Sequence, residues 1–184
     1  NSDRRQRQMC IRDRARSDLM QDKDKPLWRS MLYVPATSEK FIEKAHERGA
    51  DAIKIDLEDA VAPKEKDTAR KLVKDAAQLV SRGSADVLVR INRPLRMAVA
   101  DIESSIWPEV CGLVLPKVDS ADQINFLCEI ITELEEERGL DIGHTKLMVL
   151  IETPRGYSNV RSIASSSKRL SAIALGQELS LIHI

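Results

Sequence analysis

The chain has 184 residues, of which 42% are hydrophobic and 32% are charged. This balance is typical of a globular protein that is long enough to bury a sizeable core. Because 29 basic residues offset 29 acidic ones, the overall charge favours neither a nucleic-acid partner nor an anionic membrane surface.

Short and nearly continuous apolar runs alternate with helical patterns along the chain. This alternation is typical of βα units, in which a parallel sheet is covered on both faces. The predicted strands are residues 30–36, 51–57, 86–92, 111–118, 146–152 and 171–176.

The helices between these strands carry recognisable start signals. Ser38 is a suitable N-cap for the first helix, and Pro63 fits the first turn of the second. One face of the first helix is predicted to contain Phe41, Ile42, Ala45 and His46. A third helix is expected within residues 98–109, and Ser120 or Asp119 is expected to cap a long fourth helix.

Six βα units indicate either a (β/α) barrel or a doubly wound sheet. A dinucleotide-binding fold is disfavoured because no GxGxxG follows the first strand. A closed eight-stranded barrel typically needs about 250 residues. We therefore predict an α/β fold that is an incomplete TIM (β/α)8 barrel with about six βα units.

Residues 1–14 and 179–184 are predicted to be non-native. The last six residues read LSLIHI, and the reverse complement of a DNA sequence that encodes them also encodes Met-Cys-Ile-Arg-Asp, the sequence of residues 9–13. This shared element is similar to the mosaic end of a transposase-based sequencing adaptor. The alternative is a basic N-terminal tail that binds nucleic acid. We therefore expect the native domain to occupy residues 15–178.

Several classes of protein are disfavoured by what the sequence lacks. No apolar run approaches the roughly 20 residues that span a bilayer, and no signal-peptide core follows the charged N-terminus. The three cysteines, Cys10, Cys111 and Cys128, have no CxxC or other metal-ligand spacing. We therefore expect a cytoplasmic protein with reduced, buried thiols and with no membrane or nucleic-acid partner.

Polar side chains concentrate where the predicted strands end, which is the edge at which parallel barrels carry active sites. These residues are Asp56, Glu58, Asp59, Arg90, Asn92, Lys117, Asp119, Glu152, Thr153, Gln177 and Glu178. Singly, each has a structural interpretation: Asp59 as a helix cap, Lys117 as the partner of a carboxylate, or Arg90 in a salt bridge with Glu58. Together they form a ring of carboxylates around one arginine, which indicates a ligand site. Carboxylate oxygens favour a hard cation such as Mg²⁺.

Six motifs, in this order, indicate the function of the ring more specifically: RSMLYVPA, GADAIKIDLEDAV, VLVRIN, GLVLPKV, LIETPRG and ALGQE. They resemble the citrate lyase β-subunit-like group of the HpcH/HpaI aldolase family, over roughly residues 27–178. The resemblance implies a TIM-barrel carbon–carbon lyase that acts on a CoA thioester such as citramalyl-CoA or malyl-CoA. It also implies a Mg²⁺ or Mn²⁺ cofactor that stabilises an enolate.

The resemblance assigns roles position by position. Arg90 is the implied catalytic arginine that binds substrate, and Glu152 is implied to bind both metal and substrate. The residues expected to orient these groups are Asp56, Glu58, Asp59, Lys117 and Glu178. The family's second metal ligand follows the position of Glu178, where Leu179 stands in this chain. We therefore expect the 184 residues alone to be inactive.

Three alternatives stay open at this point. The site could belong to a metal-dependent aldolase of free 2-keto acids, it could hydrolyse a thioester, or the chain could be a non-catalytic acyl-CoA-binding fragment. The complete protein is expected to be a homo-oligomer, either a trimer or a hexamer. The residues do not identify the general base.

Overall fold

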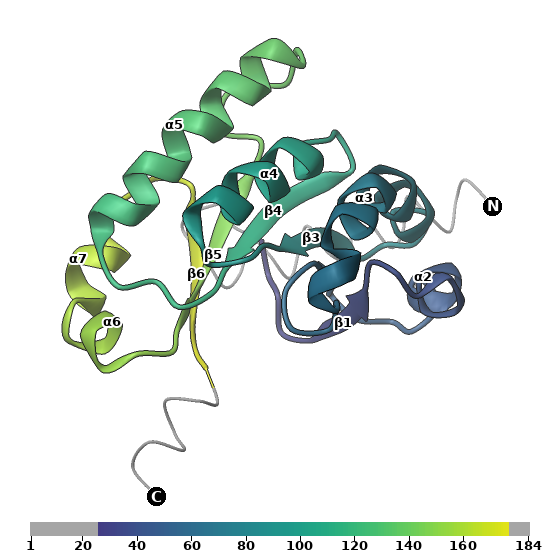
Figure 1. Ribbon diagram of the computed structural model, residues 1–184, viewed down its shortest axis with the longest axis horizontal. Coiled ribbons are helices and arrows are strands. Elements are labelled where there is room, and N and C mark those ends of the chain that lie inside the picture. Colours follow the sequence, from purple (N-terminus) through teal and green to yellow (C-terminus); the bar gives the residue numbers. More distant parts are fainter. Residues whose placement is uncertain (1–25, 177–184) are drawn as a thin grey trace, which may run out of the picture.

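The computed structural model describes residues 26–176, which form one parallel sheet with helices along its outer side (Figure 1). The predictions for residues 1–14, residues 179–184, Cys10, Gln177 and Glu178 lie outside this range. The strands are β1 Met31–Pro35, β2 Ala52–Asp56, β3 Asp86–Arg90, β4 Val110–Leu115, β5 Lys146–Ile151 and β6 Leu170–Leu175. All six predicted strands are confirmed: β1 to β5 are slightly shorter than predicted, and β6 has the predicted length but starts one residue earlier.

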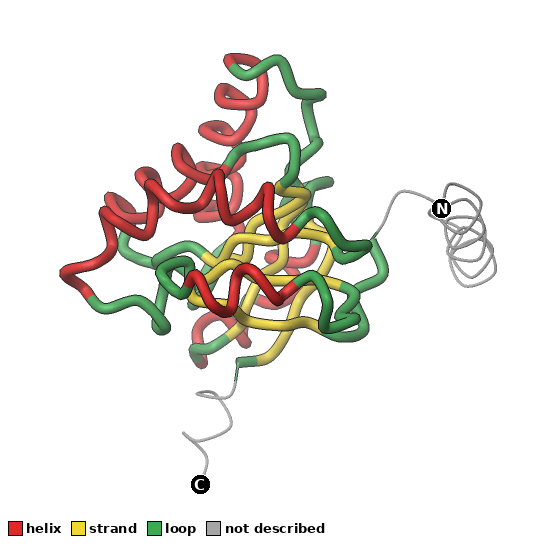
Figure 2. The backbone as a smooth tube through the Cα atoms, turned by 90° about the vertical axis from the view of Figure 1, so that its right-hand side faces the viewer, coloured by secondary structure: helices red, strands yellow, loops and turns green. Residues whose placement is uncertain are grey.

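The strand order distinguishes between the two predicted fold classes. The order is β1-β2-β3-β4-β5-β6, so every strand pairs in parallel with the next one along the chain. A doubly wound sheet would reverse this order at a switch point. Residues 26–176 therefore form five βα units and a sixth strand of a TIM barrel, and the six strands are drawn in yellow in Figure 2.

Helices of different lengths connect the strands, and α2 to α5 follow one another around the outside of the sheet (Figure 1). They are α2 Glu39–Ala45, α3 Lys66–Val80, α4 Leu95–Ser105, α5 Ala121–Glu137, α6 Pro154–Ser158 and α7 Val160–Ala164, with a short 3-10 turn η1 Pro63–Glu65 before α3. In the part of the chain that the structure describes, no helix is long and apolar enough to cross a membrane.

The predicted helix ends are confirmed in part. The Ser120 hydroxyl caps α5 by accepting a hydrogen bond of 3.4 Å from the Gln123 backbone N–H. Ser38 occupies the N-cap position of α2, but its side chain makes no capping hydrogen bond. The third helix starts at Leu95, directly after Pro94, rather than within the predicted range 98–109.

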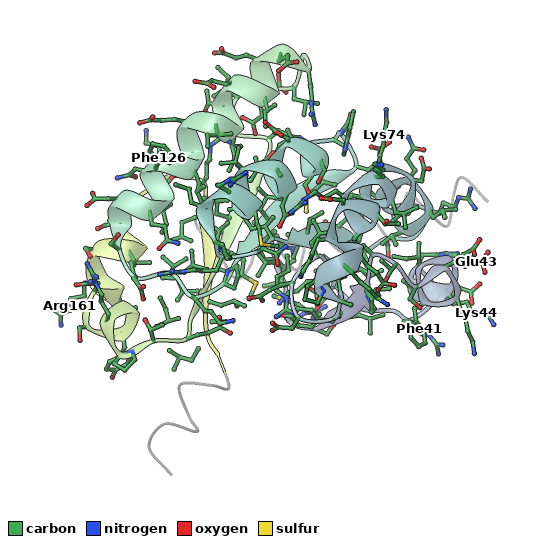
Figure 3. All side chains as sticks on the ribbon, in the orientation of Figure 1. Phe41, Glu43, Lys44, Lys74, Phe126 and Arg161 are labelled. Carbon is green, nitrogen blue, oxygen red and sulfur yellow. The ribbon has the colours of Figure 1, made fainter. Side chains whose placement is uncertain are left out.

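The prediction that Phe41 lies on the buried face of α2 is wrong, because its side chain is 56% exposed. The buried residues of this short helix are Ile42 and Ala45, which are three residues apart and therefore lie on the same side. Phe41 directly precedes Ile42 in the sequence, and its side chain points outward (Figure 3). The cysteine prediction also needs correction, because Cys111 and Cys128 are only partly buried.

The two faces of the sheet differ in the size of their buried side chains. Toward the helices, residues such as Ile53, Ile55 and Val89 join the large core. The inner face carries a smaller cluster made of Ala52, Leu88, Val114, Met148 and Leu150. Because side chains alternate along a strand, the residues beyond this inner cluster at the carboxyl ends of the strands also face the barrel interior.

A buried ion pair fixes α5 to the amino-terminal edge of the sheet. Glu135 is fully buried and accepts hydrogen bonds from both Nη atoms of Arg169, at 2.8 and 2.7 Å. The same carboxylate accepts the backbone N–H groups of Gly143 and Thr145, at 2.8 and 2.7 Å. The pair is therefore fully hydrogen-bonded and lies away from the strand ends that carry the candidate site.

Candidate active site

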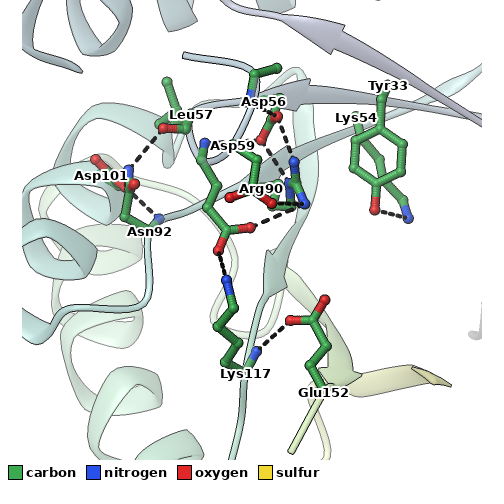
Figure 4. A network of polar contacts seen from close by, with 12 residues as sticks. Tyr33, Lys54, Asp56, Leu57, Asp59, Arg90, Asn92, Asp101, Lys117 and Glu152 are labelled. Carbon is green, nitrogen blue, oxygen red and sulfur yellow. Dashed lines mark hydrogen bonds and ion pairs between the residues drawn. The ribbon is translucent and has the colours of Figure 1, made fainter. Parts of the chain in front are cut away.

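Asp56 and Arg90 form the centre of the candidate site. The two residues are cross-strand neighbours at the ends of β2 and β3. Arg90 Nε and Nη2 donate to the two Asp56 carboxylate oxygens at 2.7 and 2.6 Å (Figure 4). The same oxygens accept the backbone N–H groups of Glu58 and Ala60, at 2.9 and 3.0 Å. Asp56 therefore fixes both the arginine and the loop that follows β2.

The charges of this pair are stabilised by their mutual contact. Burial of Asp56 opposes ionisation, but the hydrogen bonds from Arg90 and from the backbone lower the pKa of its carboxyl below the ordinary value. Burial acts against the charge of Arg90 as well, and the Asp56 carboxylate raises the pKa of the guanidinium above its ordinary value. Both side chains are therefore charged throughout the neutral pH range.

Glu58 connects the arginine to Lys117. Arg90 Nη1 lies 3.1 Å from Glu58 Oε2 and 3.4 Å from Asp59 Oδ2. Lys117 Nζ donates to the other Glu58 oxygen at 3.1 Å. Burial raises the pKa of Glu58, although Lys117 and Arg90 both favour the ionised form. Glu58 is buried and Asp59 is exposed, so Asp59 is the carboxylate of this loop that faces solvent.

The backbone at Lys117 positions Glu152. Lys117 has a φ of 51°, in the left-handed region that residues with a side chain rarely adopt. In this conformation its backbone N–H donates to Glu152 Oε2 at 2.9 Å. Gly176, at the end of β6, leaves the space for this carboxylate, because a Cβ there would collide with Glu152 Cγ.

Hydrogen bonds behind the ring hold its loops in place. Asn92 Nδ2 donates to the Leu57 carbonyl at 2.9 Å and to Asp101 Oδ2 at 2.7 Å. Lys66 Nζ donates to the carbonyls of Leu57 and Glu58, both at 2.6 Å. These contacts connect α3 and α4 to the loop after β2, so the loop that carries the carboxylates Glu58 and Asp59 is held in one conformation.

An open pocket of about 470 Å³ lies beside this network at the carboxyl ends of β2, β3 and β4. It is lined by Glu58, Asp59, Val61, Pro63, Lys66, Asn92, Arg93, Pro94 and Lys117. Most of these side chains are polar or charged, which suits a hydrophilic ligand rather than an apolar one.

The structure brings six of the seven predicted site residues into one connected network. These are Asp56, Glu58, Asp59, Arg90, Lys117 and Glu152. The expected contact of Arg90 with Glu58 is present, but the principal partner of the arginine is Asp56, which forms two hydrogen bonds with it.

Two interior residues were missed by the sequence prediction, Tyr33 on β1 and Lys54 on β2. They are cross-strand neighbours, and Lys54 Nζ lies 3.2 Å from the Tyr33 hydroxyl. A signal for them exists, because Lys54 precedes Asp56 by two residues and must therefore face the same side of the sheet. A lysine inside an otherwise apolar run was read only as part of a strand.

The described residues do not form a metal site by themselves. Within residues 26–176, no group of three or more His, Cys, Asp or Glu side chains is arranged to hold a metal ion. Mg²⁺ needs only one or two protein carboxylates when substrate oxygens and water complete its shell. Glu152, in the space left by Gly176, fits the role of one such ligand.

Known proteins resemble this chain over most of its length. The model of a family described as HpcH/HpaI aldolase/citrate lyase matches residues 29–179. The citrate lyase subunit beta of Leuconostoc mesenteroides subsp. cremoris is 39% identical over 153 residues, which cover 83% of this chain and 51% of that protein. The (3S)-malyl-CoA thioesterase of Cereibacter sphaeroides is 33% identical over 150 residues, covering 81% of this chain and 48% of that protein.

A solved structure shows the same fold. The citrate lyase beta subunit from M. tuberculosis, complexed with oxaloacetate and magnesium, superposes with a TM-score of 0.61 at 24% sequence identity. The match covers 82% of this chain and 57% of that one. The chain thus spans about half the length of the curated relatives it matches.

Proposed function

The chain belongs to the HpcH/HpaI aldolase/citrate lyase family, and on this premise we propose that the protein is a carbon–carbon lyase. Its proposed substrate is a 2-hydroxyacyl-CoA such as citramalyl-CoA or malyl-CoA, which it cleaves or forms with Mg²⁺ or Mn²⁺. The observation that carries the proposal is the arrangement of Arg90 and Glu152 at one edge of the barrel. Arg90 is fixed by Asp56, and Glu152 is fixed by the Lys117 amide.

Glu152 is the proposed metal ligand among the described residues. A bound Mg²⁺ would supply a Lewis acid for the oxygens of the substrate. The hydrogen-bonded network around Glu152 and its neighbour Lys54 contain four carboxylates and three cationic side chains. The carboxylates are Asp56, Glu58, Asp59 and Glu152, and the cations are Lys54, Arg90 and Lys117.

The protein side chains would orient the substrate and stabilise the charge that develops during cleavage. Arg90 presents a planar guanidinium whose Nη1 faces Asp59 on the open side, and we assign it to a substrate carboxylate or carbonyl. Asp56 and Glu58 position this guanidinium and do not touch substrate. When the substrate hydroxyl loses its proton and the C–C bond breaks, negative charge moves to the thioester oxygen, and fixed cations in the site stabilise it.

Thioester hydrolysis is the second candidate function. It is favoured by the resemblance to the (3S)-malyl-CoA thioesterase, which is 33% identical over the matched region. A site that binds the acyl group of malyl-CoA can release CoA if water reaches the carbonyl. The aldolase of free 2-keto acids differs from both because its substrate contains no thioester.

The test is an assay of the complete protein, including the region that these 184 residues do not contain, with Mg²⁺ and three substrates, and the products are identified by mass spectrometry. Citramalyl-CoA or malyl-CoA should give acetyl-CoA together with pyruvate or glyoxylate. Free CoA would identify the thioesterase, and cleavage of a 2-keto-3-deoxy sugar acid alone would refute the CoA-dependent proposal. Glu152→Gln is the matched control, because it keeps the hydrogen-bond acceptor for Lys117 and removes the negative charge.

A further inference from the structure

Tyr33 and Lys54 form a second polar pair in the barrel interior, next to the ring of carboxylates. The two side chains face each other across β1 and β2, with Lys54 Nζ 3.2 Å from the Tyr33 hydroxyl and 4.6 Å from its ring centroid (Figure 4). Lys54 is 3% exposed, whereas Tyr33 is 43% exposed. The tyrosine therefore lies between the buried amine and the open side of the barrel.

The surroundings of Lys54 shift its amine toward the neutral form. Within residues 26–176, the hydrogen-bond partner of its Nζ is Tyr33, and no carboxylate pairs with it. The charged or titratable groups that face it are Tyr33 from β1 and Arg90 from β3, whose Cζ lies 4.8 Å from the Tyr33 ring centroid. Burial, and secondly the charge of Arg90, lower the pKa of Lys54 to about 8.

Tyr33 keeps its proton in the same pH range and is electrostatically coupled to the site. Burial raises the pKa of its phenol, the Arg90 charge lowers it, and the carboxylates of Asp56 and Glu152 raise it further. A neutral phenol can donate its proton to one partner while it accepts a proton from another. Tyr33 can therefore connect a substrate at the ring with the buried amine.

The buried carboxylates of the ring and the proposed metal ligand are poor candidates for the missing base. Asp56 already accepts hydrogen bonds from Arg90 and from two backbone N–H groups. Glu58 is held by Lys117 and Arg90, and Glu152 is the proposed metal ligand. Packing alone does not explain Lys54 either, since an apolar side chain would fill the same space without desolvating an amine.

We propose that Tyr33 and Lys54 are the proton relay of the lyase reaction, a proposal that rests on the proposed function. In the cleavage direction, Tyr33 Oη accepts the proton of the substrate hydroxyl while it gives its own proton to the neutral Lys54 Nζ. The electron pair of the O–H bond forms the new carbonyl, the C–C bond breaks, and its electron pair moves into the thioester enolate. In the condensation direction, Lys54 returns the proton by the same path.

Ultraviolet titration tests the relay directly, because the chain has only two tyrosines. In a Tyr157→Phe background, Tyr33 is the single phenol whose absorbance changes with pH. We expect a step near pH 8, where Lys54 loses its proton and the hydrogen bond between the two side chains reverses. Lys54→Met should remove this step. Lys74→Met is the matched control, because Lys74 contacts the Trp107 ring on the outside of the barrel and should leave the step unchanged.

Two ligands test whether the pair reaches the substrate. With Mg²⁺, malate should perturb the Tyr33 absorbance because its hydroxyl donates to Tyr33 Oη, whereas succinate, which lacks the hydroxyl, should not. Equal perturbation by both ligands, or a step near pH 8 that survives Lys54→Met, would overturn the relay. If neither ligand binds to these 184 residues, which lack the implied second metal ligand, the Lys54-dependent step alone decides whether the pair shares a proton, and the lyase assay decides the proposed function.

Discussion

Replacement of Asp56 by Asn tests whether the candidate site is built around the Asp56–Arg90 pair. The substitution keeps the size of the side chain but removes its charge. One of the two carboxylate oxygens becomes an NH₂ group, which faces donors instead of acceptors. If Oδ2 is the atom replaced, the new amide opposes Arg90 Nη2 and the Ala60 backbone N–H.

The expected loss of stability follows from the burial of the pair. The side chains of Asp56 and Arg90 are only 1% and 12% exposed, so the variant leaves an arginine charge buried without its main partner. Removal of one member of a buried ion pair typically costs about 3–5 kcal/mol. Asn retains one acceptor oxygen, and Glu58 and Asp59 still lie near Nη1, so we expect about 3 kcal/mol. For a chain of this size, that corresponds to a fall in Tm of roughly 6–12 °C.

Urea unfolding of both proteins measures this difference, and its pH dependence gives an independent check. Because the folded-state pKa of Asp56 is lowered, its contribution is present above the unfolded value of about 3.9 and is lost as the pH falls below it. The difference between wild type and variant should therefore shrink in acid. The control is Asp59→Asn, whose side chain is 64% exposed and which should change stability by less than about 0.5 kcal/mol. Equal effects of the two substitutions would refute the central role of Asp56.

Three further predictions concern other parts of the molecule. Lys54→Met should raise the free energy of unfolding, measured in urea, by about 1–2 kcal/mol near pH 6. Because the pKa of Lys54 in the folded protein is lowered to about 8, this gain in stability should shrink as the pH rises from about 8 toward about 10.4. Glu135→Leu should cost about 3–5 kcal/mol, and adding Arg169→Met should restore most of it, as measured by thermal unfolding. In the complete protein, Gly176→Ala should displace Glu152 and weaken Mg²⁺-dependent malate binding at least about tenfold, or about 1.4 kcal/mol, by calorimetry, with the circular dichroism spectrum unchanged.

The sequence predicted the strands well because a parallel strand buried on both faces leaves a continuous apolar run. The run AIKID of β2 was found in this way, within the predicted range 51–57. The helix ends were predicted less well, since the start of α4 depends on Pro94 and on its packing against α3 rather than on periodicity. Phe41 was misplaced for a similar reason, because a helix of two turns has too few residues to define its buried face.

The candidate site was predicted as a set of residues but not as a set of contacts. The edge of the sheet was evident because polar residues follow each strand. The partner of Arg90 was not evident, because Asp56 and Glu58 are only two residues apart in the same motif and either could reach the arginine. The register decides between them: Asp56 lies directly opposite Arg90, whereas Glu58 lies beyond the end of the strand. A prediction from residue types alone does not contain this register.

The spacing along β2 explains how the arginine pair and the proposed relay can serve one substrate. Lys54 and Asp56 are two residues apart on the same face, which separates them by about 6.6 Å along the strand. Each has its partner on a neighbouring strand, Tyr33 for the lysine and Arg90 for the aspartate. A molecule with a carboxylate and a hydroxyl only a few bonds apart can therefore reach both pairs. A register slip of one residue would turn both β2 side chains toward the helices, so the chemistry depends on the register as strictly as on the residues.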